Sequence, residues 1–207
     1  MKDKGVAKLS IWNTGICILF LVLVTAIAHF LFSWRGFNPT DDGFILASSR
    51  RILEGQVPHL DFISIRPVGS ALLHMPFVFL DGDYTFWISR FFVWFQFACI
   101  AWVWTIIISK VLKISFNAVE KVIFALIAFA FSSHTFPIMA WYTIDGLFLL
   151  SIGLGLCLRR SQDSKLTGYT LIGMAYLCKQ SFLPMIFVIV ILGDWRRIRF
   201  WLAMAMP

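Results

Sequence analysis

The amino-acid sequence predicts an all-α integral membrane protein, folded as a polytopic bundle of helices. Of its 207 residues, 59% are hydrophobic and only 14% are charged, with a mean hydropathy of +0.82, whereas soluble domains carry roughly 25% charged residues. Uncharged runs long enough to cross a membrane recur along the chain. The basic residues, which give a net charge of +7, stand in short clusters between these runs. That placement favours membrane lipids, and not nucleic acid, as partners.

The apolar runs predict the order of the spans. The first span is expected over 11–34, because its uncharged run is long enough to be retained as an anchor and not cleaved as a secretory signal. A second span is expected over 91–109, and a helical hairpin over 122–158, broken near 132–137. The uncharged run 68–80 has 13 residues, which is too short to cross about 30 Å of hydrocarbon. It predicts a short helix at the membrane edge.

Segment 166–193 is flanked by basic residues at both ends. Three lysines among the first eight residues place the N-terminus in the cytoplasm by the positive-inside rule. A single span over 166–193 would put the following arginine cluster outside, so we predict a hairpin of two short helices that turns near Lys179. The same topology places the interval 35–67 on the outer side. We expect one transmembrane domain over residues 1–207 that is incomplete at its C-terminus.

The interval 35–67 is the longest polar stretch of the chain. It has 33 residues, many more than a connection between two spans needs, and is predicted to form a long outer first loop. Within it, 42–54 has an apolar side and ends at Gly55, which predicts an amphipathic helix lying along the interface. The interval carries eight charged residues: Arg35, Asp41, Asp42, Arg50, Arg51, Glu54, Asp61 and Arg66. This composition indicates a site held at a membrane surface.

Two positions in the interval could carry chemistry. Asp41 and Asp42 stand just outside the first span, where a carboxylate can act as a general base towards a hydroxyl. The alternative is an acidic helix N-cap, and the pair could serve both roles. Arg66 precedes Pro67 at the mouth of the short helix, and its planar guanidinium suits a phosphate. The alternative for Arg66 is a side chain that extends to lipid headgroups.

Two more candidates lie inside apolar runs. Asp145 and Lys179 are ionisable residues at membrane depth, where such residues usually face a cavity or a partner. Together with Asp41, Asp42 and Arg66 they predict an outward-facing pocket of acids and cations, suited to an anionic, lipid-anchored substrate. No metal site is assigned: His59, His74 and His134 lack metal-ligand spacing and are expected to be ordinary interfacial histidines. The four cysteines are expected to be small buried apolar residues.

Several short motifs occur in an order that resembles a known family. They are TDDGF, RRILEGQVPHLDF and RPVG in the first polar interval, and later WYTIDGLFLL and YLCKQS. This arrangement resembles the GT-C glycosyltransferases, in particular the ArnT-like, protein-mannosyltransferase-like and Rgt-like bacterial enzymes. The resemblance implies a membrane glycosyltransferase of the bacterial inner membrane. Such an enzyme moves a sugar from a polyprenyl-phosphate donor to a glycan, lipid or protein acceptor on the outer face.

The resemblance also implies roles for the candidate residues. Asp41 matches the family's catalytic acid and Asp42 a second acid, while Arg66 stands where relatives contact the carrier phosphate. Asp145 resembles an acid that lines the same cavity, and Lys179 a basic residue at the tip of a short hairpin. Some relatives have Glu before the basic residue, where it can help to hold a metal, and here that residue is Ile65. A divalent metal is possible as a cofactor, but no cofactor is implied with certainty.

Two other functions are compatible with the sequence. One is a truncated, non-catalytic membrane remnant or scaffold. The other is a transporter of lipid-linked sugars that uses the same charged cavity. A transporter of this kind would be expected to show internal pseudo-symmetry between its halves, and none is visible in the sequence.

Overall fold

The computed structural model describes residues 3–36, 43–80 and 82–206, with side chains from residue 14 onward. Helices, and no β-strand, form the regular structure of this described part, which confirms the all-α prediction. In chain order the helices are α1 Asp3–Phe32, α2 Phe44–Leu53, α3 Gly69–Leu80, α4 Thr85–Val111, α5 Ala118–Thr135, α6 Tyr142–Cys157, α7 Gln162–Cys178, the 3₁₀ helix η1 Gln180–Phe187, α8 Val188–Ile191 and α9 Ile198–Ala205.

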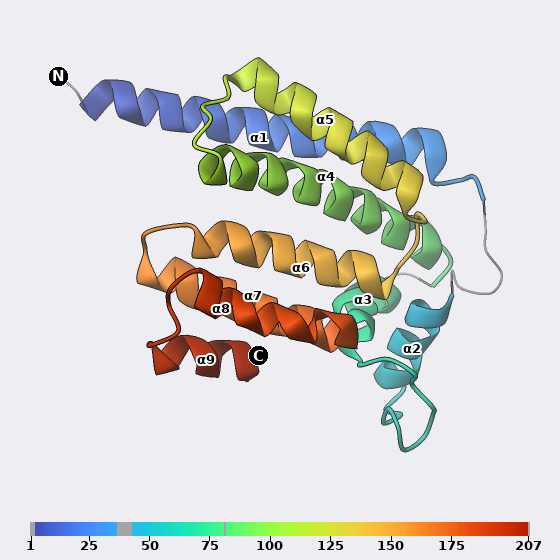
Figure 1. The fold of residues 1–207 in the computed structure, drawn as a ribbon. Coiled ribbons are helices and arrows are strands. Elements are labelled where there is room, and N and C mark those ends of the chain that lie inside the picture. Colours follow the sequence, from blue (N-terminus) through green and yellow to red (C-terminus); the bar gives the residue numbers. More distant parts are fainter. Residues whose placement is uncertain (1–2, 37–42, 81, 207) are drawn as a thin grey trace.

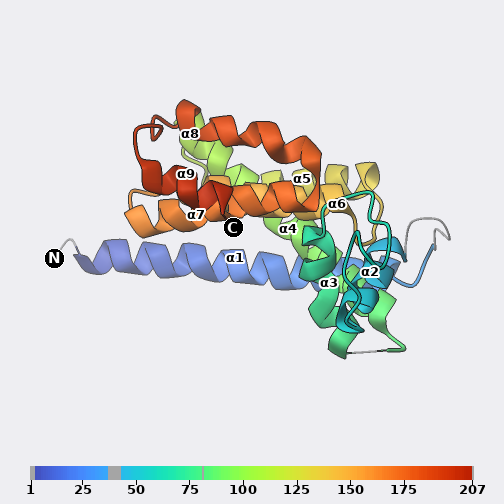
Figure 2. The same cartoon turned by 90° about the horizontal axis from the view of Figure 1, so that it is seen from below.

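The long helices lie side by side and alternate in direction (Figures 1 and 2). α4 packs against α1, α5 and α6, and α6 packs in turn against α7, which carries η1 and α9 on its other side. The short helices α2 and α3 pack together at one end of this bundle, where α1 ends and α4 and α6 begin (Figure 1). We call this the α2–α3 end. The other end contains the start of α1.

Within the described part of the chain, three helices are long and apolar enough to cross a membrane: α1 from Thr14 to Phe32, the whole of α4 and the whole of α5. The fourth expected span is shorter than predicted, because α6 has only 16 residues, or about 24 Å of helix. The chain after Pro137 stays non-helical as far as Trp141, whose backbone is extended. Ala140 in this stretch is buried in one cluster with Ile45 of α2, so the non-helical segment that precedes α6 is packed at the α2–α3 end.

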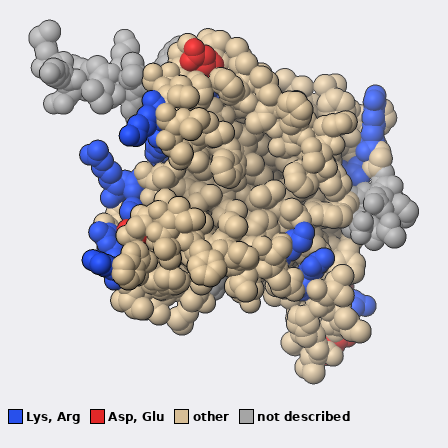
Figure 3. Space-filling model, viewed as in Figure 1, with Lys and Arg blue, Asp and Glu red and all other residues tan. Residues whose placement is uncertain are grey.

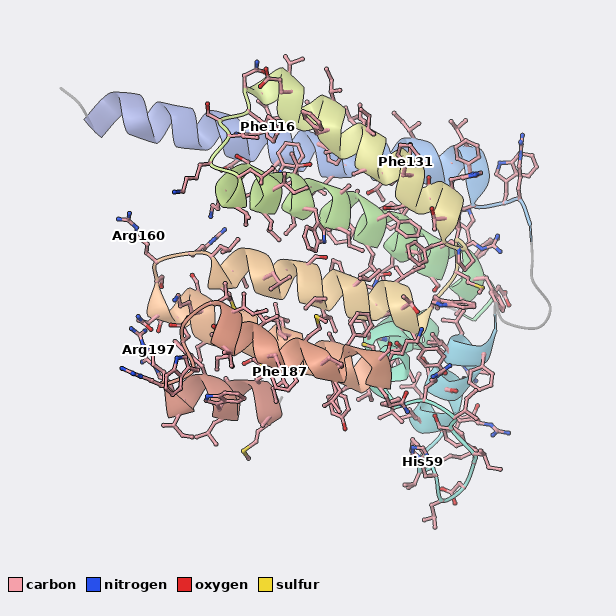
Figure 4. All side chains as sticks on the ribbon, viewed as in Figure 1. His59, Phe116, Phe131, Arg160, Phe187 and Arg197 are labelled. Carbon is pink, nitrogen blue, oxygen red and sulfur yellow. The ribbon has the colours of Figure 1, made fainter. Side chains whose placement is uncertain are left out.

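The charged side chains separate to the two ends of the molecule. Basic clusters in 110–121, 159–165 and 196–199 lie in the turns opposite the α2–α3 end. Figure 4 shows Arg160 and Arg197 projecting there and His59 projecting at the α2–α3 end. Between them the visible face is almost uncharged (Figure 3). An apolar middle with charged ends is the distribution expected of helices that cross a bilayer.

Segment 166–193 changes direction at Lys179, the position where the sequence predicts a turn. α7 ends at Cys178, Lys179 is extended (φ −154°, ψ 131°), and η1 and α8 return along α7 (Figure 1). Phe182 of η1 lies directly over Gly146 of α6, where a β-carbon would collide with its ring. This contact fixes the returning segment against the bundle.

Glycines allow α6 and α7 to approach closely. A β-carbon on Gly153 would lie 2.7 Å from the carbonyl oxygen of Gly168, and one on Gly168 would lie 2.7 Å from the carbonyl oxygen of Gly153. Because both obstacles are backbone atoms, they cannot move aside as a flexible side chain could. Small residues that let helix backbones touch are a common basis of helix packing in membranes.

A buried carboxylate joins α7 to the turn before α9. Asp194 accepts hydrogen bonds from Lys165 Nζ at 2.6 Å and from the Tyr169 hydroxyl at 3.0 Å, and Arg197 lies 3.9 Å away. Burial alone would raise the pKa of Asp194, but these hydrogen bonds and the two cations outweigh burial and lower the pKa below its usual value. The ionised form is therefore the one that stabilises the fold.

This linkage makes stability depend on pH. A lowered pKa in the folded state contributes stability above the unfolded pKa, and that contribution is lost as the pH falls through the folded pKa. We expect Asp194→Asn to lower the free energy of unfolding at pH 7 by about 2 kcal/mol. The difference from wild type should narrow below about pH 4. Unfolding of the detergent-purified protein between pH 7 and pH 3 measures this, with the exposed Asp163→Asn as the control. A difference that stays constant over this range would contradict the assignment.

Candidate functional site

A cavity of about 330 Å³ lies at the α2–α3 end of the bundle. It is formed where the start of α2, the segment before α3 and the extended stretch before α6 meet. The residues that line it are Phe44, Ile45, Ile65, Arg66, Ala140, Trp141 and Tyr142. Arg66 is thus the single charged residue in the described lining, and it is set among apolar and aromatic side chains. A cation with few water contacts attracts an anion more strongly than one in bulk solvent.

Local bonds hold the Arg66 segment in place. The Ser64 hydroxyl donates to the Arg66 carbonyl oxygen at 2.6 Å, and α3 begins at Gly69 immediately downstream. A β-carbon on Gly69 would lie 2.6 Å from the backbone of Leu177, so α3 starts in direct contact with the end of α7. The position of Arg66 is therefore tied to the position of the turn at Lys179.

The side of the cavity that α2 forms is held in place by the pairing of α2 with α3. The Ser49 hydroxyl on α2 donates to the Ala71 carbonyl on α3 at 2.7 Å, and Ser49 is fully buried. Ile45 of α2 packs against Val78 of α3 and Ala140. These contacts fix the position of α2, whose first residues, Phe44 and Ile45, line the cavity.

Lys179 brings a second cation close to this cavity. Its Nζ donates to the Thr143 hydroxyl at 2.8 Å, and Thr143 directly follows the cavity-lining Tyr142. Lys179 is half-buried, and none of the ion pairs found among the described residues includes it. Its ammonium group is therefore bonded to a neutral partner and keeps its charge available to an anion.

Asp145 is placed in the packed interior and does not contribute to the described cavity lining. It is 0% exposed, and its Oδ1 lies 3.0 Å from His74 Nε2 and accepts a hydrogen bond from Gln96 Nε2 at 2.8 Å. The Ser89 hydroxyl lies 3.3 Å from the other ring nitrogen of His74. We call these four residues the buried polar cluster. It joins α3, α4 and α6.

The buried polar cluster corrects the expectation for His74. Its place in the sequence predicts an interfacial histidine, but its side chain is 0% exposed. The reason is that His74 lies on the face of α3 that packs into the bundle against α4 and α6, while Leu72 and Phe79 of the same helix are exposed. Two signals could have indicated this cluster. Gln96 is a polar residue within a long apolar helix, and Ser89 stands seven residues earlier, on the same helix face.

The other charged groups of the 35–67 interval that the structure describes contact residues near them in the chain. Arg50 pairs with Glu54 at 2.8 Å on the exposed side of α2, and Asp61 Oδ2 accepts from the Val57 amide at 2.6 Å. Arg51 stacks on the Phe62 ring, 5.2 Å from its centroid. Of the candidates in this interval, Arg66 is the one that reaches the cavity. Asp41 and Asp42 lie outside the described residues, directly upstream of α2.

The described residues do not fit a metal site. No group of three or more His, Cys, Asp or Glu side chains that could hold a metal forms among them. The position before Arg66, where an acidic residue could supply a ligand, is Ile65, whose side chain lines the cavity. An aliphatic side chain offers no donor atom to a divalent cation.

Comparison with known proteins gives no relative of this chain. No protein family model, curated protein or solved structure matches it. A function for this chain is therefore inferred from its own sequence and structure.

A substitution at Asp145, in the buried polar cluster, is expected to lower the stability of the fold. Asp145→Asn can keep the acceptor at Oδ1 but places an amide donor where Asp145 Oδ2 is buried without a hydrogen-bond partner among the described residues. This buried, unpaired donor is expected to lower the free energy of unfolding by about 1–3 kcal/mol. Glu54→Gln removes a carboxylate from an exposed pair, for which less than about 1 kcal/mol is expected. Thermal unfolding of both variants in detergent measures the difference. Equal melting temperatures would show that the cluster does not stabilise the fold.

Proposed function

We propose that this chain is a membrane glycosyltransferase that moves a sugar from a polyprenyl-phosphate donor to an acceptor. The observation that carries the proposal is the cavity at the α2–α3 end, where Arg66 is the charged residue among aromatic and aliphatic side chains. An isolated fork of donors in apolar surroundings suits a phosphate attached to a hydrocarbon chain. The acidic pair Asp41–Asp42 stands in the sequence directly before the helix whose first residues line this cavity.

The proposed topology puts the cavity on the outer side of a bacterial inner membrane. α1, α4 and α5 cross the bilayer, and α6 together with the α7–η1 hairpin completes a polytopic bundle. The three basic clusters lie at the end opposite the cavity, as does the start of α1. Positive residues are enriched on the cytoplasmic side, so the N-terminus is cytoplasmic. The interval 35–67 then forms the long outer first loop, with α2 along the interface.

Two cations recognise the donor in this proposal. Arg66 pairs with the carrier phosphate, and Lys179, bonded to a neutral hydroxyl, adds charge from the turn of the hairpin. Positive charge at these positions stabilises the negative charge that develops on the phosphate as the sugar leaves. Asp145 acts indirectly, because it fixes α6 and therefore the cavity-lining Tyr142, which lies one turn earlier on the same helix.

The reaction is a single displacement. Asp41 accepts the proton of the acceptor hydroxyl or amine as that group forms a bond to the anomeric carbon. The bond between this carbon and the phosphate oxygen breaks, and its electron pair leaves on the polyprenyl phosphate. One displacement inverts the configuration at the sugar carbon. Asp42 stands beside the base as a second acid, and the acceptor is a glycan, lipid or protein.

Sugar transfer in membranes that contain the full chain tests the proposal. Labelled polyprenyl-phosphate hexoses and pentoses are supplied as donors, and the label released from the donor into glycan, lipid or protein is measured. Asp41→Asn should lower the rate at least about 100-fold, because it removes the general base, with membrane expression unchanged. Glu54→Gln, an exposed carboxylate of the same interval, should leave the rate unchanged.

The role of Arg66 is measured separately in the same membranes. Arg66→Gln should raise the donor concentration needed for half-maximal rate, because the phosphate loses its fork of donors. Arg50→Gln should leave it unchanged, since Arg50 pairs with Glu54 on the exposed side of α2. Transfer at the wild-type rate by Asp41→Asn would remove Asp41 from the role of base. An unchanged donor requirement in Arg66→Gln would remove Arg66 from donor binding.

A further inference from the structure

A second and larger cavity lies at the end of the molecule opposite the α2–α3 end. Its volume is about 630 Å³, and it is bounded by α1, α4, α5 and the turn after α6. Volumes of this size accommodate small ligands and headgroups. None of its described lining residues also lines the cavity at Arg66, so it is separate from the proposed glycosyltransferase site.

Three cations from three different elements line this cavity. Lys110 comes from the last turn of α4, Lys121 from the start of α5 and Arg159 from the turn that follows α6. None of them takes part in an ion pair found among the described residues. No acidic residue belongs to the described lining. Three positive charges around one space whose described lining holds no carboxylate repel one another. Solvent weakens this repulsion at the exposed Lys110 and Arg159, but its sign still favours an anion between the three.

The position of Lys121 within its helix also favours a bound anion. Lys110 and Arg159 both lie at the C-terminal end of a helix, where the negative end of the helix dipole favours a cation. Lys121 lies in the opposite situation, at the fourth residue of α5, where the positive end of the dipole disfavours a cation. The dipole of α5 therefore disfavours a lysine there, whereas an anion in the cavity would favour one in addition to the general enrichment of cations on the cytoplasmic side.

The remaining walls are apolar. Ile16 and Cys17 of α1 and Trp102 and Ile106 of α4 line the cavity, in parts of these helices that are long and apolar enough to cross a membrane. Apolar walls do not contribute to the binding of a free inorganic anion. They can bury the glycerol and first acyl carbons of a phospholipid, which is favourable. Basic pockets between membrane helices are a known way to bind anionic headgroups.

We propose that this second cavity binds an anionic phospholipid, with its phosphate among Lys110, Lys121 and Arg159 and its acyl chains along α1 and α4. α1 packs almost entirely on α4, with only slight contact to α5. A lipid in this position bridges α1 to α5 and to the turn after α6. Binding of the lipid therefore stabilises the attachment of α1 to the rest of the bundle.

Thermal unfolding of the full chain in an uncharged detergent tests the proposal. Phosphatidylglycerol should raise the melting temperature by several degrees more than phosphatidylcholine. The variant K110Q/K121Q/R159Q should lose most of this difference. The matched variant K113Q/R160Q/R196Q removes the same charge from exposed residues outside the lining and should retain it. Equal loss in both variants would indicate attraction by net charge alone and would overturn the proposal.

Two further arms make the test independent of how well the triple variant folds. Lys121→Gln alone should unfold at the wild-type temperature or higher without lipid, because it relieves the unfavourable dipole contact. The same variant should bind phosphatidylglycerol about fivefold more weakly. Inorganic phosphate and glycerol 3-phosphate are the second arm, and they should produce little of the shift. A full shift with either would identify a site for a free anion and would contradict the lipid assignment.

Discussion

The position of both walls of the candidate site depends on one carboxylate that is removed from water. Asp145 is 0% exposed, and a charge in apolar surroundings is tolerated only when partners compensate it. His74 of α3 and Gln96 of α4 both pair with its Oδ1, whereas its Oδ2 is buried without a hydrogen-bond partner among the described residues. α6 must therefore keep a fixed position relative to both helices. Arg66 precedes α3 and Tyr142 begins α6, so the width of the cavity follows from the same contact.

The two proposals assign different functions to the two ends of the molecule, although both ends use cationic side chains. At the α2–α3 end, Arg66 lines a space bounded by aromatic and aliphatic residues, Lys179 is bonded close to it at Thr143, and an acidic pair precedes α2 in the sequence. At the opposite end, Lys110, Lys121 and Arg159 surround a larger cavity whose described lining has no acid. Cations alone suit a bound anion, whereas cations together with a base suit the transfer of a group from an anion.

Composition and hydropathy predicted the all-α class, and charge clusters predicted where the chain turns, because both depend on local residue type. The break at Lys179 was predictable for that reason. The length of α6 was not, since Ala140 of the non-helical segment before it packs in one cluster with α2, a contact between segments far apart in sequence. The buried polar cluster was also missed in part. Asp145 stood out as an ionisable residue in an apolar run, but its pairing with His74 spans 71 residues and leaves no local pattern.

The most direct test of this account is a double-mutant cycle on the buried pair, with His74→Leu, Asp145→Leu and the double variant unfolded under the same conditions. If the pair compensates a buried charge, each single change leaves an uncompensated partner, while the double change leaves none. The double variant should then be destabilised by at least about 1 kcal/mol less than the sum of the two single variants. Losses that add to within about 0.5 kcal/mol would show that the two residues act independently and would contradict the account.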